Sequence, residues 1–264
     1  MLLIPGLAAG SHSWGVLLTE LRRRFRCLLV DHRVTEGNGA PDAPCTTAEM
    51  AADCLGALDA LGVDRAHVLG FSLGGMIAQE LALAHPDRIG RMVLANTGAT
   101  LEGPSREHVR RLRTLAQEGR IAAFVESLLE RSFSEPYRRE NGRMVALFGL
   151  TLSASIPPAS AVLRQIEALE THDTRTRACG IRAPVLVLSS GDDVLTPPQA
   201  GRDLSRRIPA AAFQLLPAVG HAAFIESTED FLNAVLTHLD GECPTGSRGR
   251  ALPHTAGGQE WRTS

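Results

Sequence analysis

A lone serine, Ser72, lies between Gly70 and Gly74, where an apolar run ends and a helical pattern begins. A serine on such a sharp turn is held in a strained conformation with its hydroxyl exposed, and the two glycines relieve the crowding that side chains would cause. The dipole of the following helix favours negative charge at its N-terminus. The pattern predicts a nucleophilic serine for acyl transfer. A glycine-rich turn that only packs helix on sheet is the alternative, while residues 70–75, G-F-S-L-G-G, fit the dinucleotide pattern G-x-G-x-x-G less well.

A serine nucleophile needs a base that is held in place by a third group. The stretch SGDDVLTPP, which follows a predicted strand at 183–190, offers Asp192 and Asp193 as acids. The stretch VGHAAFIE, which follows a predicted strand at 211–217, offers His221 as the base. Serine, acid and histidine then occur in the order expected when each lies on a loop after a strand of one sheet. Of the nine histidines, His221 alone fits both the order and the placement.

The elements that must position these residues alternate between strands and helices. Strands are expected at 2–4, 25–31, 66–71, 91–96, 183–190 and 211–217, and helices at 14–24, 47–61, 73–84, near 198–206 and at 228–239. The spacing of Thr46 and Glu49 is that of a capping box, which supports a helix start there. The continuous apolar run at 25–31 predicts a strand buried on both faces. This alternation predicts an α/β fold with a doubly wound, mostly parallel sheet.

Two segments break the alternation. Residues 102–172 contain amphipathic helical patterns and no convincing strand, which predicts a helical lid inserted into a core formed by 1–101 and 173–240. The ten arginines of this segment are balanced by nine acids, so it offers no case for steering an anionic substrate. Extra helices without a role in substrate choice are the alternative. Residues 241–264 are rich in glycine, proline and serine and predict a disordered tail.

Composition narrows the possible partners. With 264 residues, 44% of them hydrophobic and 21% charged, the chain can form one large domain or a domain with an insert. The net charge of −2 argues against nucleic acid as a partner. No apolar run approaches the roughly 20 residues of a membrane span, so no membrane association is expected.

The cysteines point to a reducing compartment. Five cysteines without C-x-x-C spacing make a disulfide framework or a zinc site unexpected (Cys27, Cys45, Cys54, Cys179 and Cys243). The start, MLLIPGLAAGSHSW, lacks the basic residues of a secretory signal. A cytoplasmic protein without a bound metal is therefore expected.

The motifs GFSLGG, GDDVLTPP and GHAAFIE together resemble those of the α/β-hydrolase superfamily, over roughly residues 1–240. Within it, DHR, GGMIAQELA and MVLANT are most similar to 3-oxoadipate enol-lactonases and related small-molecule esterases, including polyketide methylesterases. The resemblance implies a serine hydrolase that cleaves a small ester or lactone and needs no cofactor. It implies Ser72 as nucleophile, His221 as base and Asp193 as triad acid, with Asp192 as the alternative.

The resemblance also implies an oxyanion hole. Family members carry a His-Gly-x turn after the first central strand, and the N–H of x forms half of the hole. Here the turn reads PGL, so the N–H of Leu7 would pair with that of Leu73. Pro5 replaces the usual histidine, which a hole built from backbone groups tolerates. The stretch DHRVTEGNGAP also departs from the family's compact R-G-x-G pattern.

The start of the chain is a further departure. Met1 falls inside what would be the third strand of the family fold, and the antiparallel hairpin that normally precedes it is missing. The strand at 25–31 would then be an apolar sheet edge, which templates aggregation unless it is covered. Either the true start lies upstream, or a partner or the tail covers this edge.

Other activities remain open. A C–C bond hydrolase or a cofactor-free perhydrolase would use the same three residues, and a ligand receptor could retain them and signal by lid closure. A non-catalytic scaffold is a third class. Relatives with an aspartate nucleophile, such as dehalogenases and epoxide hydrolases, are disfavoured by the serine. The expected partner is a small-molecule substrate. The sequence does not indicate which oligomeric state the protein adopts.

Overall fold

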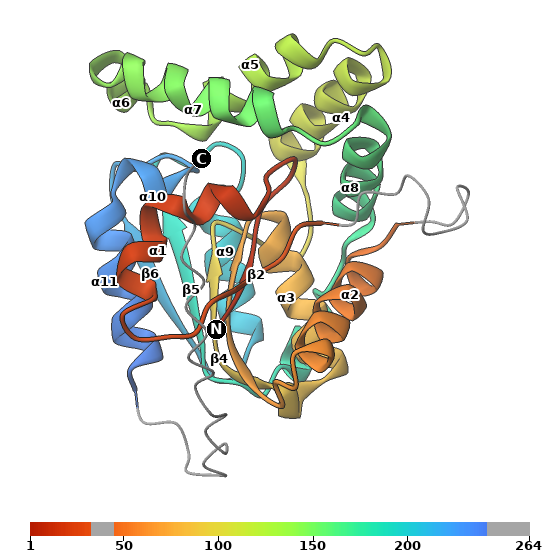
Figure 1. The fold of residues 1–264 in the computed structure, drawn as a ribbon, viewed down its shortest axis with the longest axis vertical. Helices are drawn as coiled ribbons and strands as arrows, with labels where there is room; N and C mark the ends of the chain where they lie inside the picture. The colour runs from red at the N-terminus through yellow and green to blue at the C-terminus, as the bar shows by residue number, and fades with distance from the viewer. Residues whose placement is uncertain (33–44, 242–264) are drawn as a thin grey trace, which may run out of the picture.

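The computed structural model describes residues 1–32 and 45–241, and over this part the chain forms one six-stranded sheet with helices on both faces (Figure 1). The strands are β1 (Leu2–Ile4), β2 (Leu28–Leu29), β3 (Ala66–Phe71), β4 (Ile89–Ala95), β5 (Val185–Ser190) and β6 (Ala211–Leu216). All neighbours pair in parallel, in the order β2-β1-β3-β4-β5-β6. The sequence-based prediction of a doubly wound parallel α/β fold is confirmed.

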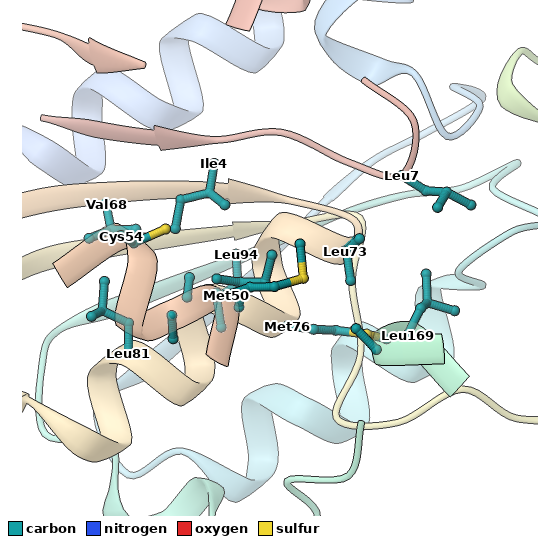
Figure 2. Close-up of a cluster of buried hydrophobic side chains, with 14 of the residues drawn as sticks. Ile4, Leu7, Met50, Cys54, Val68, Leu73, Met76, Leu81, Leu94 and Leu169 are labelled. Atoms are coloured by element: carbon teal, nitrogen blue, oxygen red, sulfur yellow. The ribbon is translucent and has the colours of Figure 1, made fainter. Parts of the chain in front are cut away.

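The strands are apolar on both faces because each face packs on a separate core. In β4, Met92 and Leu94 contribute to one core, while Val93 and Ala95 contribute to the other. The first core is covered by α2 (Thr47–Ala60), α3 (Leu73–Ala84) and α9 (Pro198–Arg207); the second is covered by α1 (Gly15–Leu21), α10 (Ala223–Glu226) and α11 (Thr228–Leu239). Figure 2 shows part of the first core, with side chains of three strands near those of α2 and α3 (Ile4, Val68, Leu94, Met50, Cys54, Met76 and Leu81).

Local sequence signals set the helix boundaries. Thr46 caps α2: its hydroxyl accepts a hydrogen bond from the N–H of Glu49, and the Glu49 carboxylate accepts one from the N–H of Thr46. The predicted capping box is therefore confirmed. Short 3-10 helices occupy η1 (Ser11–Trp14), η2 (Pro86–Arg88) and η3 (Ala178–Gly180).

Five further helices separate β4 from β5. They are α4 (Gly103–Gln117), α5 (Ile121–Ser132), α6 (Glu135–Glu140), α7 (Gly142–Ser155) and α8 (Ala159–Thr171). We call residues 103–171 the helical segment. In Figure 1, α4 to α7 lie across the top of the sheet, beyond the ends of its strands. This places the helical segment over the edge of the sheet where loops after parallel strands converge.

The strand predicted at 25–31 is wrong in extent and in burial. The observed β2 has two residues, Leu28 and Leu29, and both are only half-buried. Phe25 lies at the end of the turn that follows α1, where its N–H donates to the carbonyl of Leu21 at 2.9 Å, so it takes no part in the strand. At the edge of the six strands β2 pairs with β1 alone, so its hydrogen bonding is one-sided.

Two other sequence features lie largely outside the described residues: the DHRVTEGNGAP stretch, from residue 33 onward, and the tail expected after 240, from residue 242 onward. Within 1–32 and 45–241, no single helix is long and apolar enough to cross a membrane; α7 and α8 pass that test only as a pair bent by 108°.

Candidate active site

Ser72 occupies the junction between β3 and α3 in a strained backbone conformation. Its φ of 54° and ψ of −118° are rare for a residue with a side chain. The N–H of Ser72 donates to the carbonyl of Ala95 at 2.9 Å, which fixes the turn against the end of β4. The serine is partly exposed. The sequence-predicted turn therefore exists, and it presents a hydroxyl at the ends of the strands.

The glycines around Ser72 are required by close backbone contacts. A Cβ on Gly70 would lie 2.4 Å from the carbonyl oxygen of Gly74. A Cβ on Gly74 would lie 2.0 Å from the carbonyl oxygen of Ile4. Neither position can hold a larger residue without a backbone shift, because the contacts are with main-chain atoms. The tight turn thus brings the end of β1 directly against the start of α3.

Asp193 is held by a set of donors in the loop after β5. Its Oδ1 accepts hydrogen bonds from the N–H groups of Leu195 and Thr196, both at 2.8 Å. Its Oδ2 accepts from the hydroxyl of Thr196 at 2.7 Å and from Nδ2 of Asn96 at 2.9 Å. The residue is only 3% exposed. This many donors fix the orientation of the carboxylate and stabilise its ionised form.

His221, in the loop after β6, completes this cluster. Its Nδ1 lies 2.7 Å from Oδ2 of Asp193, and the residue is 6% exposed. The ring packs on Phe71, with 4.9 Å between ring centroids. Burial on its own would raise the pKa of Asp193, but the adjacent His221 and the hydrogen bonds from Thr196 lower it below its usual value. The arrangement holds Nδ1 of the imidazole to a carboxylate, which leaves Nε2 for chemistry.

The structure separates the two neighbouring aspartates. Asp192 is exposed, and its N–H donates to the carbonyl of Val219 at 2.9 Å. The buried Asp193 is the aspartate that contacts His221.

Ser72 and His221 line one cavity together with the predicted oxyanion residues, Leu7 and Leu73. Its wall is mostly apolar and comes from both the sheet and the helical segment. The contributing residues of the helical segment and of the stretch that leads into it are Leu101, Ser105, His108, Val109, Leu112, Leu128, Ser132, Phe148, Leu152 and Leu169. Among the described lining residues, none is an arginine, lysine, aspartate or glutamate. The cavity suits a small, largely apolar molecule.

The turn that carries Leu7 lies against the serine. A Cβ on Gly6 would be 3.4 Å from the Cβ of Ser72. Leu73 is the first residue of α3, where the helix leaves N–H groups without intrahelical partners. Figure 2 shows Leu73 at this end of α3 and Leu7 on the turn after β1. Both backbones therefore approach the position of Ser72, as an oxyanion hole would require.

Three further residues at the site were given no role in the sequence analysis, although Asn96 and Glu226 lie within the quoted stretches MVLANT and GHAAFIE. Asn96 adopts a left-handed φ of 47° at the end of β4, and its Nδ2 also donates to Ser190 at 2.9 Å. His108 lines the cavity, and burial, followed by Arg131 and Arg111, lowers its pKa to about 4. Glu226 accepts a hydrogen bond from the N–H of Gly220 at 3.1 Å. The contact of Asn96 with Ser190 spans 94 residues and is created by the fold, whereas the contact of Glu226 with Gly220 depends on the conformation of one loop. For Asn96, the position at a strand end was the available signal.

Within the described ranges, no group of three or more histidine, cysteine, aspartate or glutamate side chains has the arrangement of a metal site.

Comparison with known proteins places this geometry in a family. The model of the α/β-hydrolase fold family matches residues 1–228. A Caulobacter sp. (strain K31) protein named as a proposed carbamate hydrolase, RutD, is 33% identical over 248 residues, covering 92% of this chain and 91% of the relative.

Two solved structures are also similar. A hydrolase from Pseudomonas aeruginosa PA01 has a TM-score of 0.79 and 32% identity, covering 91% of this chain and 89% of the other. The enol-lactonase from Burkholderia xenovorans LB400 has a TM-score of 0.82 and 29% identity, with 90% of each chain covered. The sequence-based resemblance is confirmed, and the chain belongs to the α/β-hydrolase fold family.

Proposed function

We propose that the protein is a serine hydrolase that cleaves a small ester or lactone through an acyl-enzyme. One observation carries the proposal: the strained Ser72 lines the same apolar cavity as His221, whose Nδ1 is held by the buried Asp193. A nucleophile, a base and a group that orients the base are the parts that acyl transfer requires.

In the proposed first step, the hydroxyl of Ser72 attacks the substrate carbonyl and its proton passes to Nε2 of His221. Asp193 stabilises the imidazolium, and the N–H groups of Leu7 and Leu73 donate to the oxyanion. The tetrahedral intermediate then collapses. The single bond between the carbonyl carbon and the leaving-group oxygen breaks, and the proton on His221 is delivered to the departing alkoxide. Water then attacks the acyl-serine with the same base, which releases the acid and restores Ser72.

The cavity supports an uncharged, apolar acyl or alcohol part. Its described wall carries leucine, phenylalanine and valine side chains, and His108 is neutral near pH 7 because its pKa is about 4. A carbamate is a second candidate substrate, which the 33% identical relative named for carbamate hydrolysis favours. Attack on a carbamate uses the same carbonyl chemistry and differs in the leaving group.

We also propose that residues 102–172 form a lid that selects substrates. The apolar wall contributed by Leu112, Leu128 and Leu152 supports this role, since it faces the same cavity as Ser72. A cytoplasmic location is a further proposal; it is supported by the free cysteines among the described residues (Cys27, Cys45, Cys54 and Cys179).

The test is a panel of p-nitrophenyl esters, lactones and carbamates of increasing acyl length. The wild type is compared with Ser72→Ala and with Ser153→Ala, which changes an exposed serine of α7. We expect Ser72→Ala to lower kcat by roughly 10^4-fold or more on every substrate that the wild type cleaves, and Ser153→Ala to leave it unchanged. Wild-type turnover by Ser72→Ala would refute the proposed nucleophile. Ligand binding without turnover of any substrate would favour a receptor instead.

A further inference from the structure

The loop that carries His221 is held by backbone hydrogen bonds on both sides of the histidine, and one of them reaches the helical segment directly. On one side, the N–H of Ala222 donates to the carbonyl of Ser132 at 2.7 Å. On the other, the N–H of Gly220 donates to Oε2 of Glu226 at 3.1 Å. The backbone before and after His221 is therefore fixed by groups that lie outside the Asp193 cluster.

Glu226 joins this loop to the helical segment through a single carboxylate. Besides the N–H of Gly220, its Oε2 accepts from the N–H of Ser134 at 3.0 Å. Its Oε1 accepts a short hydrogen bond from the hydroxyl of Ser134. Ser134 also caps α6, because its Oγ accepts from the N–H of Tyr137 at 3.3 Å. Three donors thus converge on Glu226, and two of them come from the junction between α5 and α6.

The packing at this junction leaves little freedom. A Cβ on Gly220 would lie 2.5 Å from the backbone nitrogen of Ser134 and 2.7 Å from the carbonyl carbon of Phe133. The residue before His221 therefore contacts the helical segment backbone to backbone. A shift of residues 132–134 would displace His221, because no flexible side chain separates the two segments.

The charge of Glu226 suits this role. Hydrogen bonds from neutral donors to a carboxylate are shorter and stronger than those between neutral groups. Tyr137 lies close enough to feel this carboxylate, since burial, followed by the charge of Glu226, raises the pKa of the tyrosine hydroxyl.

We propose that Glu226 is a positioning residue that sets the place of His221 and couples it to the α5–α6 junction. The inference rests on the proposed function, in which His221 is the catalytic base. Residues 132–134 then serve as a fixed anchor of the helical segment, and any movement that admits substrate has to occur in other parts of that segment.

The first test compares Glu226→Gln with Glu229→Gln. Glutamine keeps the size of Glu226 but places an N–H₂ group among three donors, whereas Glu229 is an exposed residue three positions along the chain. We expect Glu226→Gln to lower kcat by about 10- to 100-fold with little change in KM, because a small misplacement of a catalytic group costs rate rather than substrate affinity. We expect wild-type kinetics from Glu229→Gln. An unchanged kcat in Glu226→Gln would overturn the proposal.

The second test observes His221 without relying on turnover. A proton on Nδ1 that is shared with a carboxylate gives a strongly downfield NMR signal, which is assigned here by its loss in Asp193→Asn. In a Ser72→Ala background, we expect Glu226→Gln to shift or broaden this signal and Glu229→Gln to leave it in place. An unshifted signal in Glu226→Gln overturns the positioning role even if Ser72 proves to be the nucleophile. Full activity of Ser72→Ala would instead refute the proposed function, while the signal would still report on Glu226.

Should Glu226→Gln fail to fold, Ser134→Ala replaces it in both tests. This variant removes one hydroxyl donor and leaves the carboxylate bonded to two N–H groups. We expect a fall in kcat of about 2- to 10-fold, which corresponds to one lost hydrogen bond, with the same direction of change in the NMR signal. Unchanged kcat and an unchanged signal would overturn the proposal.

Discussion

Replacing Asp193 with asparagine is predicted to reverse the hydrogen bond to His221. The two N–H groups that donate to Oδ1 belong to the backbone of Leu195 and Thr196 and cannot reorient. The new amide must therefore place its oxygen at the Oδ1 position and its N–H₂ group at the Oδ2 position. Nδ1 of His221, 2.7 Å from Oδ2, then has to accept a hydrogen bond instead of donating one. This forces the proton onto Nε2, which can no longer accept the proton of Ser72.

The expected loss is large because the base is held in the wrong tautomer and the imidazolium loses its counter-charge. Substitutions of this type in serine triads lower kcat by about 10^4-fold, which corresponds to about 5 kcal/mol of transition-state stabilisation. The buried site adds to this effect, since Nδ2 of Asn96 would face the new amide as a second donor. Asp192→Asn should change kcat by less than about threefold, because the Asp192 side chain is exposed and its charge is screened by solvent.

The assay measures kcat and KM for the best ester of the panel, with Asp192→Asn as the matched control. Circular dichroism at the assay temperature checks that both variants are folded. A severe Asp192→Asn phenotype beside a mild Asp193→Asn phenotype would refute the reasoning, because the exposed aspartate would then be the one that orients the histidine.

Three other changes test separate parts of the account. Asn96→Ala removes a hydrogen-bond donor to Asp193 and a residue type that tolerates the φ of 47°. In ester kinetics kcat should fall by about 10-fold, and in urea denaturation the free energy of unfolding should fall by about 1–3 kcal/mol. Unchanged values would contradict the role of Asn96. Leu152→Ala should change the relative kcat/KM of short and long acyl chains severalfold, whereas Leu150→Ala, at a site 69% exposed, should not; equal effects would count against a lid that selects substrates. Burial, opposed by Glu80, lowers the pKa of His172 from 6.5 to about 4. As the pH drops, the histidine of the unfolded chain therefore binds a proton before that of the folded chain does. The free energy of unfolding should fall by about 3 kcal/mol between pH 6.5 and pH 4. Denaturation of His172→Gln should lack most of this fall, while the exposed His12→Gln should retain it; identical pH profiles for all three proteins would refute the assignment.

The parts of the fold with strong local patterns were predictable. The strand at 66–71 and the helices at 73–84 and 228–239 have the predicted bounds, because their apolar spacing and flanking turn residues agree with the tertiary fold. The length and burial of the strand predicted at 25–31 were overestimated, because an apolar run indicates hydrophobicity but not how many neighbouring strands will pair with it. Here one neighbour pairs with only two of its residues.

The site divides in the same way. Ser72 and His221 were selected by motif and chain order, both of which are local in sequence. The choice between Asp192 and Asp193 depends on the conformation of one loop, since adjacent side chains point in different directions. The contact of Asn96 with Asp193 spans 97 residues, and that of Glu226 with Ser134 spans 92. Contacts of this separation are created by the sheet order and by the placement of the helical segment, so sequence reasoning did not reach them.

The most direct test of the central claim is to identify the residue that acts as the nucleophile. The protein is treated with a fluorophosphonate, which forms a stable bond to an activated serine, and the modified peptide is located by mass spectrometry. The account predicts one adduct per chain on Ser72, its absence in Ser72→Ala, and a much slower reaction in His221→Ala. An adduct on another serine, or no adduct on a protein that hydrolyses the ester panel, would contradict the proposed mechanism.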